Sequence, residues 1–159
     1  MSMDRDAFRS VLGRFASGIT VVTTCTDDGH DHGMTVSAFC SVSLNPPLVL
    51  VCVAKNADMY KVLKKVSHFT VNILAAHQEA LSRRFADLDA EQRFEGIGFR
   101  RGKFGAPVLH DILAYVECAV HERHDAGDHG IVIGEVQHAA ARDDRPLLYY
   151  RGGYAQLER

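Results

Sequence analysis

A series of short β-branched or apolar segments, separated by turn residues, constrains the fold more than any other feature of the sequence. Residues 19–26 are rich in valine and threonine and end at the turn signal Asp27-Asp28-Gly29. Residues 48–53 (LVLVCV) follow Asn45-Pro46-Pro47 and are apolar throughout, which predicts a strand buried on both faces. Further strands are expected at residues 34–42, 68–74, 116–120, 131–139 and 147–150, with a turn at residues 124–130.

Apolar residues at helical spacing predict three short helices among these strands. The first helix would carry an apolar stripe made of Phe8, Val11, Leu12 and Phe15. Residues 59–66 and 81–88 show the same spacing. Because about seven strands and three helices do not alternate regularly, the sequence favours a mainly β fold. We expect an antiparallel, Greek-key-like barrel with helices at its ends rather than a doubly wound sheet.

The size and charge of the chain limit what it can do. We expect a single domain over residues 1–159, since a chain of 159 residues has room for one sizeable core. A net charge of −2 argues against a nucleic-acid partner. The longest apolar run, residues 46–54, is too short to cross a membrane, and no signal peptide is visible. The four cysteines are scattered, which favours a reduced, cytoplasmic protein.

Several common chemistries lack their sequence motifs. There is no G-x-S-x-G motif of a nucleophilic serine, and no cysteine has an activating neighbour. His121 and His124 would point to opposite faces of a strand, so they make a poor chelate, and we expect no metal site. Gly96-Ile97-Gly98 lacks the third glycine of a Rossmann motif. Any pyridine nucleotide must therefore be held in another way.

Two segments carry positive signals for a phosphorylated, ring-containing ligand. Lys55-Asn56 joins an expected strand to an expected helix, where free backbone N–H groups favour phosphate, and Arg83-Arg84 adds guanidinium groups. Residues 33–47 place the hydroxyls of Thr35, Ser37, Ser41 and Ser43 on one expected strand face, which suits a flat ring rich in hydrogen-bonding groups such as isoalloxazine. Considered alone, Lys55-Asn56 and Arg83-Arg84 are better explained by an asparagine helix cap with surface cations. For the strand, composition does not distinguish a ligand-binding face from one polar, solvent-facing side.

The order of these motifs resembles the flavin reductase-like family. The matching segments are FRSVLGRFASGITVVTT, GMTVSAFCSVSLNPPLVLVCV, FTVNIL, LSRRFA, AGDHGIVIGEV and PLLYYRGGY, and together they span roughly residues 8–157. The resemblance implies an FMN-binding split β-barrel of six or seven strands that forms a homodimer. It also implies direct hydride transfer from NADH or NADPH to N5 of non-covalently bound FMN or FAD. The reduced flavin would then pass to a partner flavin-dependent monooxygenase.

Transferred residue by residue, the resemblance assigns a role to each part of the site. The isoalloxazine would be lined by Thr35, Val36, Ser37, Ala38 and Ser41. The ribityl phosphate would be held by Lys55, Asn56, Arg84 and Phe85. His129 would face the nicotinamide as a positioning donor, and the pocket would be completed by Tyr150, Arg151 and Phe15. Ser37 replaces a common asparagine, and Gly130 replaces a larger residue, which would open the nicotinamide side.

Three alternatives keep a related fold but change the function. A flavin-binding electron carrier would not turn over NAD(P)H, and the Gly127-Asp128-His129 turn argues against it. An oxidase related to pyridoxamine phosphate oxidases would need a second basic cluster. A reductase could also serve another acceptor, such as a corrinoid. The sequence does not distinguish FMN from FAD, NADH from NADPH, or a tightly bound flavin from a diffusing one.

Overall fold

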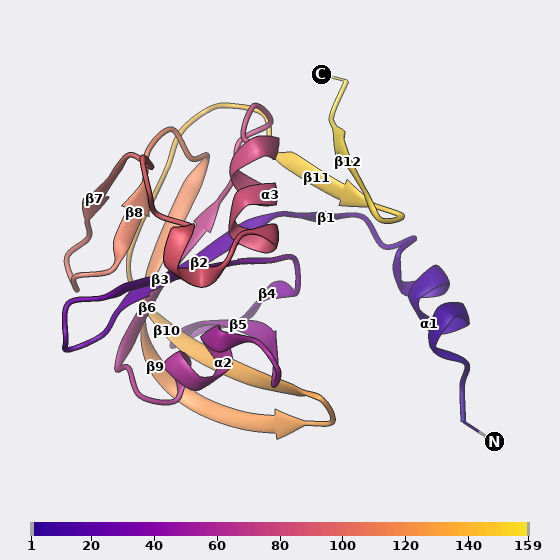
Figure 1. Ribbon diagram of the computed structural model, residues 1–159, viewed down its shortest axis with the longest axis horizontal. Coiled ribbons are helices and arrows are strands. Elements are labelled where there is room, and N and C mark those ends of the chain that lie inside the picture. Colours follow the sequence, from indigo (N-terminus) through magenta and orange to yellow (C-terminus); the bar gives the residue numbers. More distant parts are fainter. Residues whose placement is uncertain (1, 159) are drawn as a thin grey trace.

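A seven-stranded antiparallel sheet forms the body of the computed structural model, which describes residues 2–158 (Figure 1). Its strand order is β3-β2-β6-β9-β10-β5-β4. The expected mainly β, antiparallel architecture is therefore confirmed. The strands of this sheet are β2 (Thr20–Cys25), β3 (Asp31–Val36), β4 (Phe39–Leu44), β5 (Pro47–Ala54), β6 (His68–Ile73), β9 (Ala114–Ala126) and β10 (His129–Ala141).

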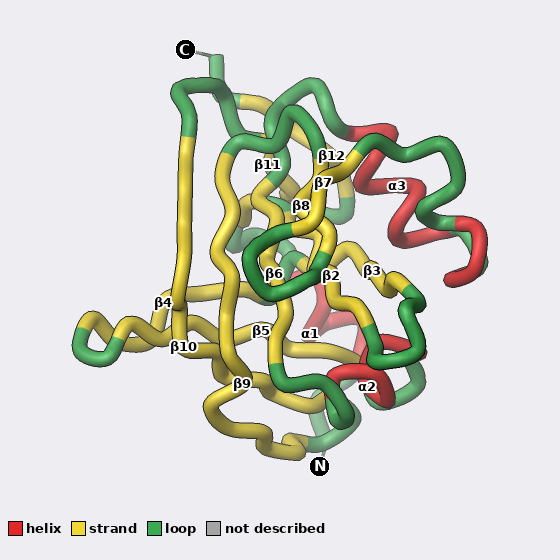
Figure 2. The backbone as a smooth tube through the Cα atoms, turned by 90° about the vertical axis from the view of Figure 1, so that its left-hand side faces the viewer, coloured by secondary structure: helices red, strands yellow, loops and turns green. Residues whose placement is uncertain are grey.

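Smaller elements surround this sheet. A second sheet has the order β1-β11-β12, and β7 pairs with β8. In Figure 2, α2 and α3 lie on the right, away from the long strands β9 and β10 on the left. The three expected helices are present, at Arg5–Leu12 (α1), Asp58–Leu63 (α2) and Glu79–Asp87 (α3), together with a 3-10 turn at Ala90–Gln92. The short strands are β1 (Ser17–Gly18), β7 (Phe99–Arg101), β8 (Pro107–Leu109), β11 (Leu147–Tyr150) and β12 (Gly153–Gln156).

Two apolar clusters form the core, and β2 separates them. Val22 packs in one cluster with Val51 and Phe69, whereas Val21 packs in the other with Phe85. β2 is therefore buried on both faces, and four consecutive residues of β6 are buried as well. The expectation that residues 48–53 are buried on both faces is wrong, because β5 buries only alternate residues. Its other face is half-buried, as is usual for an antiparallel strand with one face on the core.

Three expected boundaries are also wrong. The expected strand at residues 34–42 breaks into β3 and β4, because Ser37 and Ala38 lead the chain from one edge strand of the sheet to the other. The expected turn at residues 124–130 shrinks to Gly127 and Asp128, because β9 and β10 pair as far as Ala126 and His129. β5 begins at Pro47, a first-strand position where the missing N–H is tolerated.

Gly134 in β10 leaves space that the core fills. A Cβ built there would lie 2.6 Å from the ring of Phe69 and 2.7 Å from Cβ of Cys118. We expect Gly134→Ala to lower the free energy of unfolding by about 1–3 kcal/mol through overpacking. Urea unfolding followed by circular dichroism measures this change. Gly18→Ala is the control, because no atom lies within 4 Å of the added Cβ; equal stability of both variants would contradict the packing.

Candidate functional site

The corner between β3 and β4 exposes backbone as well as small side chains. Ser37 and Ala38 are both exposed. The carbonyl of Ala38 accepts a hydrogen bond from the N–H of Cys52 (3.0 Å). Within residues 2–158, no hydrogen-bond acceptor is found for the N–H groups of Ser37 and Ala38. Two unpaired donors on a fixed corner can hydrogen-bond the carbonyl and nitrogen acceptors of a flat ring.

The hydroxyls around this corner do not share one strand face, contrary to the sequence-based expectation. Thr35 Oγ1 donates to the carbonyl of Ser82 in α3 (2.7 Å), so this hydroxyl already has an acceptor. A bulge in β4 changes the register between Ser41 and Ser43. Because a one-residue shift reverses the face of a strand, Ser41 and Ser43 point to opposite sides. Val36 is buried in the core.

Lys55 and Asn56 follow β5 and lie beside the start of β10. The N–H of Lys55 donates to the carbonyl of Asp128 (2.9 Å), and its Nζ lies 3.9 Å from a carboxylate oxygen of Asp125. The hydroxyl of Tyr60, with a smaller contribution from Lys55, holds the pKa of Asp125 below its usual value. Lys55 is three residues beyond Cys52, the neighbour of Ala38, so about 10 Å of strand separates the cation from the corner.

His129 lies at this same end of the sheet, where it pairs with Ala54 of β5. Its Nδ1 is 2.7 Å from the carboxylate of Asp128, and this contact holds the pKa of Asp128 below its usual value. The contact engages Nδ1 and leaves Nε2 for a ligand. The imidazole is half exposed and borders a cavity of about 390 Å³, whose other walls include Arg5 and Arg9 of α1.

Arg84 and Phe85 of α3 are held by the protein itself. Arg84 Nε donates to the carbonyl of Arg93 (2.7 Å), and its Nη2 donates to the carbonyls of Gln92 (3.0 Å) and Glu95. Phe85 is fully buried, and its ring meets that of Phe94 edge to face. The side chain of Phe85 therefore supports the wall behind β3 and has no exposed surface for a phosphate.

Tyr150 ends β11, and Arg151 begins the turn to β12, which contacts the end of α1. The N–H of Arg151 donates to the carbonyl of Gly13 (2.8 Å). Arg9, Arg14 and Arg151 border a second cavity of about 360 Å³. Phe15 lies beyond the end of α1 and is 82% exposed. The structure thus places these residues along α1, and Arg9 borders both this cavity and the one at His129.

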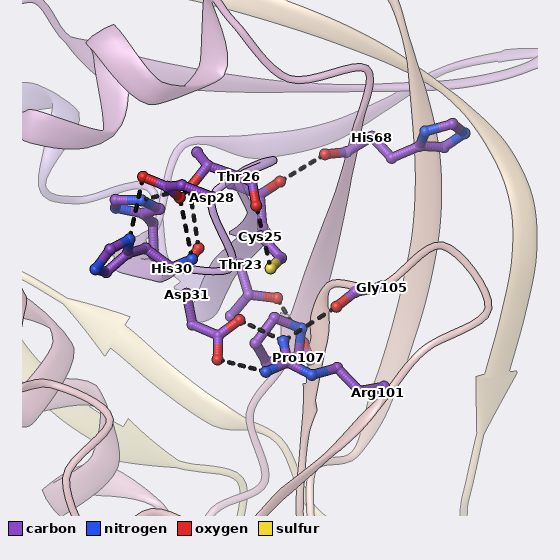
Figure 3. Close-up of polar contacts among 12 residues, drawn as sticks. Thr23, Cys25, Thr26, Asp28, His30, Asp31, His68, Arg101, Gly105 and Pro107 are labelled. Carbon is purple, nitrogen blue, oxygen red and sulfur yellow. Dashed lines mark hydrogen bonds and ion pairs between the residues drawn. The ribbon is translucent and has the colours of Figure 1, made fainter.

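A polar cluster elsewhere in the molecule offers no nucleophile (Figure 3). Arg101 binds both carboxylate oxygens of Asp31. Burial raises the pKa of the nearby Cys25 thiol, and the Asp31 carboxylate raises it further. Burial also raises the pKa of Cys52, and that of Cys118 to about 12. These thiols stay protonated at neutral pH and are poor nucleophiles.

Within residues 2–158 the structure contains no group of three or more His, Cys, Asp or Glu side chains arranged to hold a metal ion. The same residues include no helix that is both long and apolar enough to span a membrane.

The sequence analysis missed the two arginines of α1 beside His129. Their spacing is a readable signal, because residues four apart lie on the same face of a helix. The prediction for this helix used only its apolar stripe. Only the packing of α1 near the β9–β10 turn gives Arg5 and Arg9 a place at the site.

Comparison with known proteins identifies close relatives along nearly the whole chain. The family described as "Flavin reductase like domain" matches residues 12–158. The reductase subunit HsaB of a flavin-dependent monooxygenase from Rhodococcus jostii is 38% identical over 158 residues, covering 99% of this chain and 80% of the relative. The FMN reductase (NADH) SmoA of Agrobacterium fabrum is 41% identical over 153 residues, covering 96% of this chain and 86% of SmoA.

Solved structures show the same similarity. The NADH:FAD oxidoreductase SgcE6 of Streptomyces globisporus, in complex with NAD and FAD fragments, superposes with a TM-score of 0.91 at 38% identity. The match covers 97% of this chain and 93% of SgcE6.

Proposed function

The chain belongs to the family of flavin reductase-like domains, and we propose that it is an NAD(P)H:flavin oxidoreductase that transfers a hydride from NADH or NADPH to FMN or FAD. The similarity to proteins named as NADH-dependent reductases of FMN and FAD supports this activity. The observation that carries the proposal is the position of His129 beside the end of β5, next to Lys55, with the Ser37-Ala38 corner hydrogen-bonded to Cys52 of the same strand. This arrangement suits a flavin and a nicotinamide bound side by side.

The exposed corner and the following loop fit the two ends of a flavin. The unpaired N–H groups of Ser37 and Ala38 would hydrogen-bond the ring, with Ser41 beside them. Lys55 and Asn56 would hold the ribityl phosphate, about 10 Å further along β5. Bound flavin supplies the redox chemistry, while the protein supplies binding, orientation and electrostatics.

The remaining candidate residues shape the site or complete it. Thr35 fixes α3 against β3, and the ring of Phe85 packs against Gly33 of β3, so both would set the position of the corner. Arg84 would act by holding α3 to the segment at residues 92–95. Val36 would support the corner through its packing in the apolar core. On the nicotinamide side, Tyr150, Arg151 and Phe15 would contribute from the other end of α1.

His129 would position the nicotinamide through Nε2, with Asp128 orienting the ring. We expect His129→Ala to raise KM for NADH about 3- to 10-fold, the value of one hydrogen bond, and to leave flavin affinity unchanged. Steady-state kinetics and flavin titration measure the two effects. His124→Ala is the matched control, since His124 is an exposed histidine of the same hairpin. Equal changes in both variants, or a loss of flavin affinity, would remove His129 from the nicotinamide side.

The biological setting of the enzyme follows from its relatives and its cysteines. Relatives named as reductase subunits of monooxygenases support a partner monooxygenase that uses the reduced flavin. All four cysteines are free, which supports a reducing, cytoplasmic location. The sheet and the two core clusters draw on most of the chain, which supports one domain over residues 1–159.

An exposed apolar surface on α1 supports a homodimer. The helix buries none of its residues, and Val11 and Leu12 are 67% and 52% exposed. An eight-residue helix with an uncovered apolar stripe is marginal in water. On β4, Leu44 is 97% exposed. A second copy of the chain would cover these side chains in an isologous contact.

Steady-state oxidation of NADH and NADPH, with and without FMN, FAD or riboflavin, tests the proposed activity. We expect oxidation that depends on flavin and saturates with one or both nucleotides. The same assay identifies the preferred flavin and nucleotide. A protein that binds flavin but oxidises neither nucleotide would contradict the proposal and favour an electron carrier.

A further inference from the structure

Two unpaired arginines face the candidate nicotinamide residue across a cleft. The cavity of about 390 Å³ at His129 is bounded on one side by Asp128 and His129 and on the other by Arg5 and Arg9. Within the described residues, neither arginine forms an ion pair, although both are exposed on α1. Neither guanidinium group is therefore held in an ion pair in this part of the chain, although the charge of Arg5 adds to the effect of His129 in lowering the pKa of Asp128.

The spacing of these arginines suits a diphosphate. They are four residues apart, about 6 Å along the helix axis and on the same face. Two guanidinium groups so placed can each bind one of two linked phosphates, and arginine binds phosphate oxygens through paired N–H donors. The carboxylate of Asp128 is engaged by Nδ1 of His129, which reduces its repulsion of an anion in the cleft.

The cationic surface continues along the helix. Arg9 also borders the second cavity, where Arg14 and Arg151 lie together with one carboxylate, that of Asp6. Nη1 of Arg14 donates to Oγ of Ser10 (2.9 Å), which holds that side chain along α1. A ligand that starts at His129 and extends along α1 would therefore meet Arg5, then Arg9, then Arg151. An extended dinucleotide has this form, with its charged linkage between two uncharged ends.

We propose that Arg5 and Arg9 bind the pyrophosphate of the pyridine dinucleotide, so that α1 forms one wall of its binding cleft. This inference rests on the proposed function, which supplies the nucleotide as substrate. A dimer contact on α1 would lie directly beside this cleft, because Phe8 of the apolar stripe borders it together with the two arginines.

A comparison of two hydride donors tests the proposal. NADH carries the pyrophosphate, whereas reduced N-benzylnicotinamide carries the reacting ring without any phosphate. We expect the double variant Arg5→Gln/Arg9→Gln to raise KM for NADH about 10- to 100-fold, as expected for the loss of charge-assisted hydrogen bonds. Its kcat/KM with reduced N-benzylnicotinamide and its flavin affinity should match those of the unaltered protein.

The single variants Arg9→Gln and Lys103→Gln each remove one positive charge, so a comparison of the two controls for the change in net charge. Lys103 is an exposed cation in the loop between β7 and β8, so its loss should leave both donors unaffected. An unchanged KM for NADH in the double variant would overturn the proposal. Equal losses with both donors would also overturn it, since they would indicate a role in the fold or in flavin binding. If the unaltered protein oxidised neither donor, the proposed reductase function itself would fail.

Discussion

Replacing Val11 and Leu12 by aspartate is expected to convert the proposed dimer into a monomer. The side chains are exposed on a helix that buries nothing, so the double variant should leave the folded chain intact. In a dimer contact, however, two unpaired carboxylates would be buried. Their desolvation costs several kcal/mol, on the order of a thousandfold in the dimer dissociation constant. Sedimentation should then give the mass of one 17.6 kDa chain.

Reductase activity should fall together with the dimer, because the dimer contact would hold α1 in place. The same helix carries Arg9 and contacts the turn at Arg151. Ser10→Asp is the control, since Ser10 lies away from the apolar stripe and beside Arg14. It should keep the dimer. A double variant that sediments like the unaltered protein would show that α1 does not form the contact.

Replacing Phe85 by alanine is expected to destabilise the fold rather than weaken flavin binding specifically. Phe85 is fully buried between Phe94 and Gly33, where an added Cβ would lie 2.6 Å from the ring. Loss of a buried phenylalanine costs about 3–5 kcal/mol, a large part of the roughly 5–15 kcal/mol that stabilises a typical domain. Urea unfolding measures the change directly.

Phe104→Ala is the matched control for this variant. Phe104 is 42% exposed and stacks on His68, so its loss should cost about 1 kcal/mol. If Phe85→Ala kept normal stability but lost flavin affinity, the resemblance-based role of Phe85 as a direct ligand contact would be supported instead.

Local patterns predicted most strands and helices, but tertiary contacts determined their burial. The β-branched run at residues 19–26 and the helical spacing at residues 81–88 both give the expected elements. Residues 48–53 are apolar at every position, yet β5 has only one face on the core. Periodicity identifies a strand but does not show which layers cover it. It also misses the corner at Ser37-Ala38, where the chain changes from one sheet edge to the other.

The candidate site could be predicted in type but not in full. Ser37, Lys55 and His129 were identified by resemblance; the structure places Lys55 and His129 together at one end of β5 and β10, and Ser37 lies in the corner beside Cys52 of β5. Their roles in binding remain proposals. Arg5 and Arg9 could not be predicted from local sequence, because their place depends on how α1 lies against a hairpin more than 100 residues away.

Anaerobic mixing of the flavin-loaded protein with NADH or NADPH tests the central claim most directly. Without oxygen or a partner enzyme, the flavin absorbance reports hydride transfer within the protein alone. We expect rapid, stoichiometric bleaching that slows when the transferred hydrogen of the nucleotide is deuterium. Flavin that stays oxidised with both nucleotides would contradict the assignment as a flavin reductase.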